Sequence, residues 1–280
     1  EMFRSLKSQT PKGSAWAGAL SYDLVQWTQP IQLQYPPKEG EILAILWLVD
    51  EWLENEVVFP ELPKPLKMEG ERSSHTDEQH SEIVNQIKNS ITAGELYQLN
   101  FGRTWEGPLG EDPACVFHRL AINNPAPFSG YIEAADLGIA LASSSPEILL
   151  ETKEGVVMTA PIKGTRLRGS DSDQESLLRR DLVHDQKERA EHRMLVDLMR
   201  NDLSAVCEVG SVNIERFDIE TFSNVQHLVS HLKGRLLDSE NGMTAFNSIF
   251  PGGSITGCPR TMVCAVIDQI ENQSRSFWTG

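Results

Sequence analysis

The sequence has few of the features that mark secreted or membrane-bound proteins. It contains four cysteines in 280 residues, and none of them has C-x-x-C spacing. Such usage is typical of a reducing compartment rather than of a disulfide-bonded scaffold. No run of about 18 uncharged apolar residues is present, and the opening EMFRSLKSQTPKGSAW has no apolar signal-peptide core. We therefore expect a cytoplasmic protein without a membrane span.

Positive charge is scarce, with 25 Lys and Arg against 40 Asp and Glu and a net charge of −15. Such a surface repels nucleic acid and anionic membranes, so neither is an expected partner. It would also repel an anionic substrate unless a local cation or a metal offsets the charge.

The loop PGGSITGCP at 251–259 lacks the lysine of a nucleotide-binding P-loop. Because a helix follows, its backbone N–H groups are suited to hold a carboxylate.

Strand and helix patterns are mixed along the chain. Apolar stretches at 16–27 and 41–52 indicate strands, and proline and charge at 61–76 indicate a linker. Thr76 and Gln79 form a capping box that begins a helix. Further helices are predicted at 113–120, 174–203, 242–250 and 258–271, with strands between them. Because strands and helices do not alternate strictly, an α+β fold is favoured over a doubly wound sheet.

The stretch LYQLNFGRTW at 96–105 alternates with a period of two. Tyr97, Leu99 and Phe101 share one face, which we expect to be buried in the core. Gln98 lies on the opposite face and is expected to point toward solvent or a cleft.

A single lysine stands inside TAPIKGTRLRG, at 159–169. Strand-forming residues precede Lys163, and Gly164 follows it and would allow the backbone to approach another group closely. Lysines are usually solvated surface charges. Lys163 is therefore either an ordinary turn residue or a residue directed into a cleft.

Three carboxylates and a histidine are further candidates. Glu188 and Glu191 are three residues apart on one helix face, which is typical of a solvated helix but also suits Mg²⁺. Glu147 either ends a polar strand or, if shielded from water, acts as a general acid. His227 alternates with valines and is either a hydrogen-bonded core residue or a functional one.

Five ordered blocks resemble the signature of the chorismate-utilising enzymes: SSSPE, PIKGT, KERAEHRMLVDLMRNDL, VQHLVS and FPGGSITGCPR. This family includes component I of anthranilate synthase and of aminodeoxychorismate synthase, and the isochorismate and salicylate synthases. The resemblance extends from about residue 80 to the end and, more loosely, to GALSYDL near the start. It implies an α+β chorismate-binding fold of four α/β/β/α layers, with the active site between two facing sheets.

The resemblance also implies roles for the candidate residues. Lys163 would be the nucleophile, Glu147 the general acid and His227 a hydrogen-bond donor to the leaving hydroxyl. Gln98 would lie in the same cleft. Isochorismate and salicylate synthases have a lysine at the position of Gln98 that activates water, and a glutamine cannot be that base.

A metal and substrate contacts are implied in the same way. Glu191 would bind Mg²⁺, and Glu188 would be a second ligand or support the first. The expected contacts to the substrate are made by Gly164, Thr165, Ser254, Thr256 and Gly257.

The residue at position 163 favours one branch of the family. Anthranilate synthases typically have alanine there, whereas PIKGT is typical of aminodeoxychorismate synthases. The predicted reaction is therefore chorismate plus ammonia to 4-amino-4-deoxychorismate, for para-aminobenzoate and folate synthesis. The expected partner is a glutamine amidotransferase subunit that delivers the ammonia.

The chain departs from the family pattern at both ends. We expect a partial N-terminal segment at 1–60, the linker at 61–76, and a catalytic domain at 77–280 that lacks the family's strand-rich C-terminal segment. Arg260 replaces the lysine that usually follows the proline of the 251–259 loop. Anthranilate formation is one alternative, and the other is a truncated module that binds chorismate or an amidotransferase without turnover.

Overall fold

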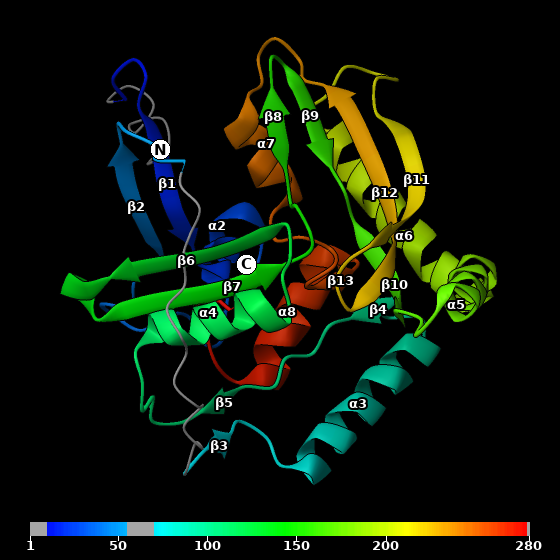
Figure 1. Cartoon of the computed structure of the whole chain (residues 1–280), viewed down its shortest axis with the longest axis horizontal. Coiled ribbons are helices and arrows are strands. Elements are labelled where there is room, and N and C mark those ends of the chain that lie inside the picture. Colours follow the sequence, from blue (N-terminus) through cyan, green and yellow to red (C-terminus); the bar gives the residue numbers. More distant parts are fainter. Residues whose placement is uncertain (1–9, 55–69, 279–280) are drawn as a thin grey trace.

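The computed structural model describes residues 10–54 and 70–278, and these form an α+β fold, as predicted (Figure 1). The helices are η1 (Tyr22–Leu24), α2 (Val25–Thr28), α3 (Asp77–Thr92), α4 (Pro113–Asn123), η2 (Ala135–Leu137), α5 (Ser172–His184), α6 (Gln186–Ser204), α7 (Gly242–Ile249) and α8 (Arg260–Glu271). None of the described helices is long and apolar enough to cross a membrane.

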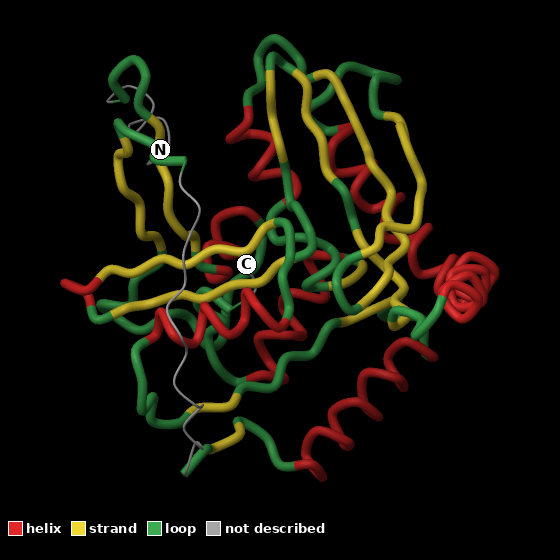
Figure 2. Tube along the Cα trace, viewed as in Figure 1, coloured by secondary structure: helices red, strands yellow, loops and turns green. Residues whose placement is uncertain are grey.

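One antiparallel five-stranded sheet (Figure 2) contains four of the candidate residues, namely Lys163, Gly164, Thr165 and His227. Its central strand β12 (Val225–Arg235) pairs with β11 (Asn213–Thr221) along its length. The first half of β12 pairs with β10 (Ile162–Leu167), and its second half pairs with β9 (Val156–Thr159). The edge strand β8 (Glu151–Lys153) pairs with β9. Because β10 and β12 are neighbours, Lys163 and His227 lie on adjacent strands.

The other described strands form four two-stranded pairs. They are β1 (Ala15–Leu20) with β2 (Ala44–Val49), β3 (Arg72–Ser73) with β5 (Trp105–Glu106), β4 (Gln98–Leu99) with β13 (Gly257–Cys258), and β6 (Phe128–Ala134) with β7 (Ile139–Ser145).

Helix α6 packs against the five-stranded sheet and α7 and forms the largest core cluster. Its buried side chains recur at helical spacing, and the cluster brings them together with residues of β9, β12 and α7: Leu195, Val196, Met199, Leu203, Val157, Leu232, Ala245 and Ile249. Burying this stripe directs the first turns of α6 toward β10, which α6 also contacts. The glutamates of KERAEH thereby lie beside PIKGT.

The capping box expected at Thr76 is confirmed at the start of α3. The Thr76 hydroxyl accepts a hydrogen bond from the Gln79 N–H at 3.2 Å, and the Gln79 side-chain oxygen accepts one from the Thr76 N–H at 2.8 Å. The helix ends at Thr92, and Gly94 follows with φ +77°. Local capping chemistry therefore determined where this helix begins.

The predicted strand at 16–27 is wrong beyond Leu20. The Ser21 hydroxyl accepts a hydrogen bond from the Asp23 N–H at 3.1 Å and begins helical turns that run to Thr28. A serine cap of this kind offers the backbone a local alternative to a sheet ladder. The strand at 41–52 is confirmed in part, as β2.

The alternation expected at 96–105 is also wrong in part. Strand β4 has two residues, Tyr97 is 65% exposed, and Leu96 is buried instead. Leu96 packs against α8 residues Val263 and Ile267, and that contact determines which side chain enters the core. A two-residue pairing with β13 is too short to impose a period of two.

Parts of the predicted domain division lie outside the described residues, namely 1–9 and 55–60 of the N-terminal segment and 61–69 of the linker. The rest of the predicted linker contains strand β3, which pairs with β5. The Ser74 N–H also donates to the Thr104 carbonyl at 2.9 Å. Residues 72–74 therefore belong to the folded unit rather than to a free connection.

Candidate active site

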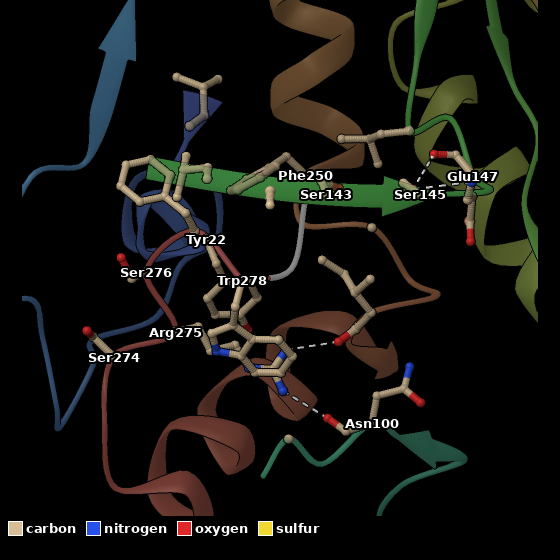
Figure 3. A pocket seen from close by; sticks show the side chains of 18 of the residues that line it. Tyr22, Asn100, Ser143, Ser145, Glu147, Phe250, Ser274, Arg275, Ser276 and Trp278 are labelled. Atoms are coloured by element: carbon tan, nitrogen blue, oxygen red, sulfur yellow. Dashed lines mark hydrogen bonds between the residues drawn. The ribbon is translucent and has the colours of Figure 1, made fainter. Parts of the chain in front are cut away.

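A cavity of about 1320 Å³ lies among β7, the loop at 252–255 and the segment at 274–278 (Figure 3). Glu147 and Ser254 line it, so two of the predicted site residues face a space large enough for a small dicarboxylate. The loop that carries Glu147 is held by Ser145, whose hydroxyl donates to the Glu147 carbonyl at 3.1 Å.

The Glu147 side chain is adapted to hold a proton. Burial raises its pKa from the ordinary 4.5 to about 7, while the Ser254 hydroxyl, the Ile162 N–H and the charge of Lys163 act in the opposite direction. A carboxyl group with such a pKa is present in both protonation states near neutral pH. It is therefore suited to donate a proton to a leaving group.

Lys163 lies on strand β10 and is not a turn residue. The register of β10 against β12 shifts between Lys163 and Thr165, and Gly164 at the shift has φ +85°. Glycine adopts this left-handed backbone readily, and bulges of this kind redirect neighbouring side chains. The Lys163 Nζ lies 3.3 Å from Glu191 Oε2, and the side chain is 26% exposed.

His227 contacts the same bulge from β12. Its Nδ1 lies 3.0 Å from the Thr165 hydroxyl and 3.3 Å from the Gly164 carbonyl oxygen. A carbonyl only accepts, so this second contact is a hydrogen bond when Nδ1 carries the proton. The Nε2 of the neutral ring is then an acceptor. Burial lowers the pKa of His227, which favours this neutral form.

Glu188 and Glu191 both face β10 from the start of α6. The Asp185 carboxylate caps the helix by accepting from the Glu188 N–H at 3.0 Å. Glu188 Oε1 lies 3.5 Å from Arg166 Nη1, just as Glu191 faces Lys163. The pair is therefore not a freely solvated helix face.

These two carboxylates suit Mg²⁺ as a partial donor set. Mg²⁺ in proteins is usually held by one or two carboxylates together with waters and substrate oxygens. Within residues 10–54 and 70–278 no group of three or more His, Cys, Asp or Glu side chains could hold a metal by itself. A metal here would therefore need further oxygens, from water or from a substrate.

The loop at 254–257 is attached to strand β4. The Asn100 side-chain amide donates to the Ser254 carbonyl, and the Asn100 N–H donates to the Thr256 carbonyl at 2.7 Å. The Thr256 side chain is fully buried and donates to the Gly252 carbonyl at 2.8 Å. The Thr256 hydroxyl therefore stabilises the loop, which leaves the backbone of Thr256 as the part that could contact a substrate.

The predicted residues thus fall into two groups, one around Lys163 and Glu147 and one around Gln98. Lys163 contacts Glu191, and Gly164 and Thr165 contact His227. Glu147 contacts Ser254 and is influenced by the charge of Lys163. In the other group Gln98 pairs with Cys258, next to Gly257, through the backbone of β4 and β13.

Sequence reasoning missed Arg166, which contacts three carboxylates. Its guanidinium lies 2.7 Å from Asp181 and 2.8 Å from Asp185, in addition to Glu188. It thereby fixes both the cap of α6 and the orientation of Glu188. Its place in the strand after PIKGT was a usable signal, because a strand beside a carboxylate-rich helix is expected to carry a cation toward that helix.

Gly257→Ala is expected to lower the free energy of unfolding by roughly 2–4 kcal/mol. Gly257 has φ +139°, and a Cβ atom there would lie 2.1 Å from the Gln98 carbonyl oxygen. Urea unfolding followed by circular dichroism measures the change. The control is Gly210→Ala, where φ is +78° and the space is open; its expected cost is about 1 kcal/mol. Equal costs for the two variants would contradict the close approach of β4 and β13.

Glu147→Gln is expected to stabilise the protein increasingly as pH rises. The folded pKa of Glu147 lies above the ordinary value, so the folded state retains a proton that the unfolded state loses. Wild-type stability therefore falls, relative to the glutamine variant, between about pH 4.5 and pH 7 and is constant above that. The difference reaches about 3 kcal/mol at pH 8. Urea unfolding of both proteins from pH 4 to pH 8 measures it, and a difference that does not change with pH would contradict the burial of this carboxyl.

Comparison with known proteins gives one consistent result. The family model described as chorismate binding enzyme matches residues 41–280. The chain is 38% identical over 206 residues to aminodeoxychorismate synthase component 1 of Bacillus subtilis (strain 168), which covers 73% of this chain and 43% of that protein. It is 37% identical over 214 residues to anthranilate synthase component 1 of Mycolicibacterium smegmatis. That match covers 75% of this chain and 41% of the relative. The chain thus spans less than half the length of these curated relatives.

Solved structures share the fold. Anthranilate synthase component I from Streptococcus pneumoniae TIGR4 superposes with a TM-score of 0.79 at 23% identity, covering 97% of this chain and 68% of that chain. A second structure is that of DhbC from Bacillus anthracis, described as a putative 2,3-dihydroxybenzoate-specific isochorismate synthase. It superposes with a TM-score of 0.73 at 19% identity, and the match covers 100% of this chain and 71% of that chain.

Proposed function

Because the chain belongs to the family of chorismate binding enzymes, we propose that it acts on chorismate as component I of an aminodeoxychorismate synthase. The reaction is chorismate plus ammonia to 4-amino-4-deoxychorismate and water. The observation that carries this choice is Lys163 in PIKGT, which lies at a β-bulge, pairs with the carboxylate of Glu191 and exerts its charge on the carboxyl of Glu147. An amine in that place supports covalent amination chemistry rather than direct attack by ammonia.

In the proposed mechanism Lys163, as a neutral amine, forms a bond to the ring of chorismate. The C4–oxygen bond breaks, and Glu147 donates the proton with which the hydroxyl leaves as water. Ammonia then bonds to C4 and the bond to Lys163 breaks. The proton that the new C4 ammonium loses returns to Glu147, so the neutral lysine and the acid are both regenerated. The substrate carboxylates are held by the backbone N–H groups of the 254–257 loop, with Ser254 beside Glu147.

The hydrogen bond expected from His227 to the leaving hydroxyl depends on the tautomer of its ring. The neutral ring can donate from Nε2 when Nδ1 accepts from the Thr165 hydroxyl, but not when Nδ1 donates to the Gly164 carbonyl. We assign proton transfer itself to Glu147, because burial lowers the pKa of His227. His227 contacts the Gly164 carbonyl and the Thr165 hydroxyl, next to the bulge on which the direction of Lys163 depends.

Glu191 and Glu188 would hold a Mg²⁺ ion together with a substrate carboxylate. The chemistry that such an ion supplies when bound is charge neutralisation and electron withdrawal at that carboxylate. Neutralisation matters here because the protein has a net charge of −15 and the substrate is a dianion.

The proposal extends to the partner and the pathway. Ammonia would come from a glutamine amidotransferase subunit, and the product would serve para-aminobenzoate and folate synthesis in the cytoplasm. The relatives named component 1 support a two-component enzyme.

The experiment is incubation of the chain with chorismate, ammonium and Mg²⁺ at mildly alkaline pH, with products identified by mass spectrometry. Formation of 4-amino-4-deoxychorismate, which retains the enolpyruvyl group, supports the proposal. Absence of any aminated product at saturating ammonium contradicts it.

Anthranilate formation is the second candidate, and the identity of 37% to an anthranilate synthase component favours it. That reaction also eliminates pyruvate from the ring. The same incubation distinguishes the two, because anthranilate is fluorescent and its formation releases pyruvate in equal amount.

A further inference from the structure

The candidate metal ligand Glu191 is already occupied by two ammonium groups. Lys163 Nζ lies 3.3 Å from its Oε2, and Lys187 Nζ lies 3.6 Å from its Oε1. The two lysines differ in their surroundings, because the Lys163 side chain is 26% exposed and the Lys187 side chain is 82% exposed. Water screens the charge of Lys187 much more than that of Lys163.

The neighbouring carboxylate is paired in the same manner. Glu188 lies 3.5 Å from Arg166, and Arg166 is fixed by Asp181 and Asp185. Arg166 therefore has other partners that hold it if Glu188 turns away. Lys163 pairs with Glu191, and its charge also acts on the carboxyl of Glu147.

We propose that Lys163 and a divalent cation compete for Glu191, so that metal binding releases Lys163 from this ion pair toward Glu147. An ammonium group and a dication repel one another at a shared carboxylate, and the repulsion is strong where little water intervenes. The ion pair thereby serves as the resting state of the empty site. Release moves the amine to the side of the cleft where Glu147 and Ser254 lie.

If this competition occurs, the identity of residue 163 also determines how tightly the site binds the metal. A protein with an uncharged residue at this position retains only the exposed, water-screened Lys187 as an internal competitor for Glu191 and should bind the metal more tightly. Lysine therefore weakens metal binding in the empty cleft, and by linkage the bound metal weakens the Lys163–Glu191 contact to the same degree. The inference rests on the metal site of the proposed function.

The test is titration of the chain with Mn²⁺, with the free ion counted by electron paramagnetic resonance. Lys163→Met keeps the length of the side chain and removes its charge, and we expect it to tighten Mn²⁺ binding about tenfold. The matched control Lys187→Met removes a charge from the same carboxylate, and its expected effect is less than about twofold. Glu191→Gln is expected to weaken binding at least tenfold, roughly the loss of a charged ligand.

The outcomes separate the two proposals. If Lys163→Met binds Mn²⁺ no more tightly than the wild type while Glu191→Gln binds it more weakly, the competition is overturned and the metal site stands. Binding that Glu191→Gln leaves unchanged overturns the metal site and the competition together. The identity of the product is read independently, from chorismate and ammonium. Thermal melting of each variant verifies folding, and Lys163→Gln repeats the test if the methionine variant does not fold.

Discussion

Lys163→Ala is expected to lower the rate of 4-amino-4-deoxychorismate formation by at least about 10³-fold. The substitution removes the amine that forms the covalent bond, and no other described lysine contacts Glu191 from within the sheet. Stability should change little, because the side chain is partly exposed and removing it leaves Glu191 paired with Lys187. The rate is measured by mass spectrometry at saturating chorismate and ammonium.

Lys187→Ala is the matched control for this prediction. It removes the other ammonium group beside Glu191, but from an exposed position on α6. Its rate is expected to remain within about twofold of the wild type. If Lys163→Ala retains wild-type amination, Lys163 is not the nucleophile and ammonia attacks chorismate directly.

Glu271→Ala is expected to lower the free energy of unfolding by roughly 3–5 kcal/mol, the largest loss of stability that we predict for a single side chain. Glu271 and Arg275 form a buried pair at the end of α8, with contacts of 2.8 and 2.5 Å and exposures of 1% and 2%. Removing the carboxylate leaves the guanidinium charge buried without its counterion. It also removes the acceptor of the Gly102 N–H.

The pair connects segments that lie far apart in the sequence. The guanidinium of Arg275 donates to the Ile255 and Asn100 carbonyls, both at 2.9 Å, and stacks on Tyr22 and Trp278 (Figure 3). Loss of the pair should therefore also disturb the 254–257 loop. We expect weaker binding of chorismate in whatever fraction of the variant remains folded.

Urea unfolding followed by circular dichroism measures the effect of Glu271→Ala. The control is Asp197→Ala, which breaks the exposed pair between Asp197 and Arg200 on α6. Solvent screens that pair, so its loss should cost less than about 1 kcal/mol. A similarly small loss for Glu271→Ala would contradict the buried pair as a major source of stability.

Local signals in the sequence predicted those features that depend on nearby residues. The capping box of α3, the helical pattern over the residues of α6 and the glycine beside Lys163 each act within a few positions of the chain. The five ordered blocks likewise indicated the family and its α+β fold. Those predictions agree with the helices, the sheet and the family match.

Features that depend on a distant partner were not predictable in this way. Whether Tyr97 or Leu96 is buried depends on packing against α8. Nothing in the sequence around Arg275 distinguishes it from an exposed charged residue. In the structure it is buried among the segments that carry Asp23, Asn100, Ile255 and Glu271.

The sequence by itself determined the kinds of chemical group available: a lysine before a glycine, two carboxylates on one helix face, a carboxyl after a serine run and a histidine among valines. The tertiary structure decided which of them meet. A bulge directs Lys163 toward Glu191, burial adapts Glu147 to hold a proton, and Arg166 restrains Glu188. The reason is physical, because charge pairing and desolvation depend on distance and on exclusion of water, and both are set when remote segments pack together.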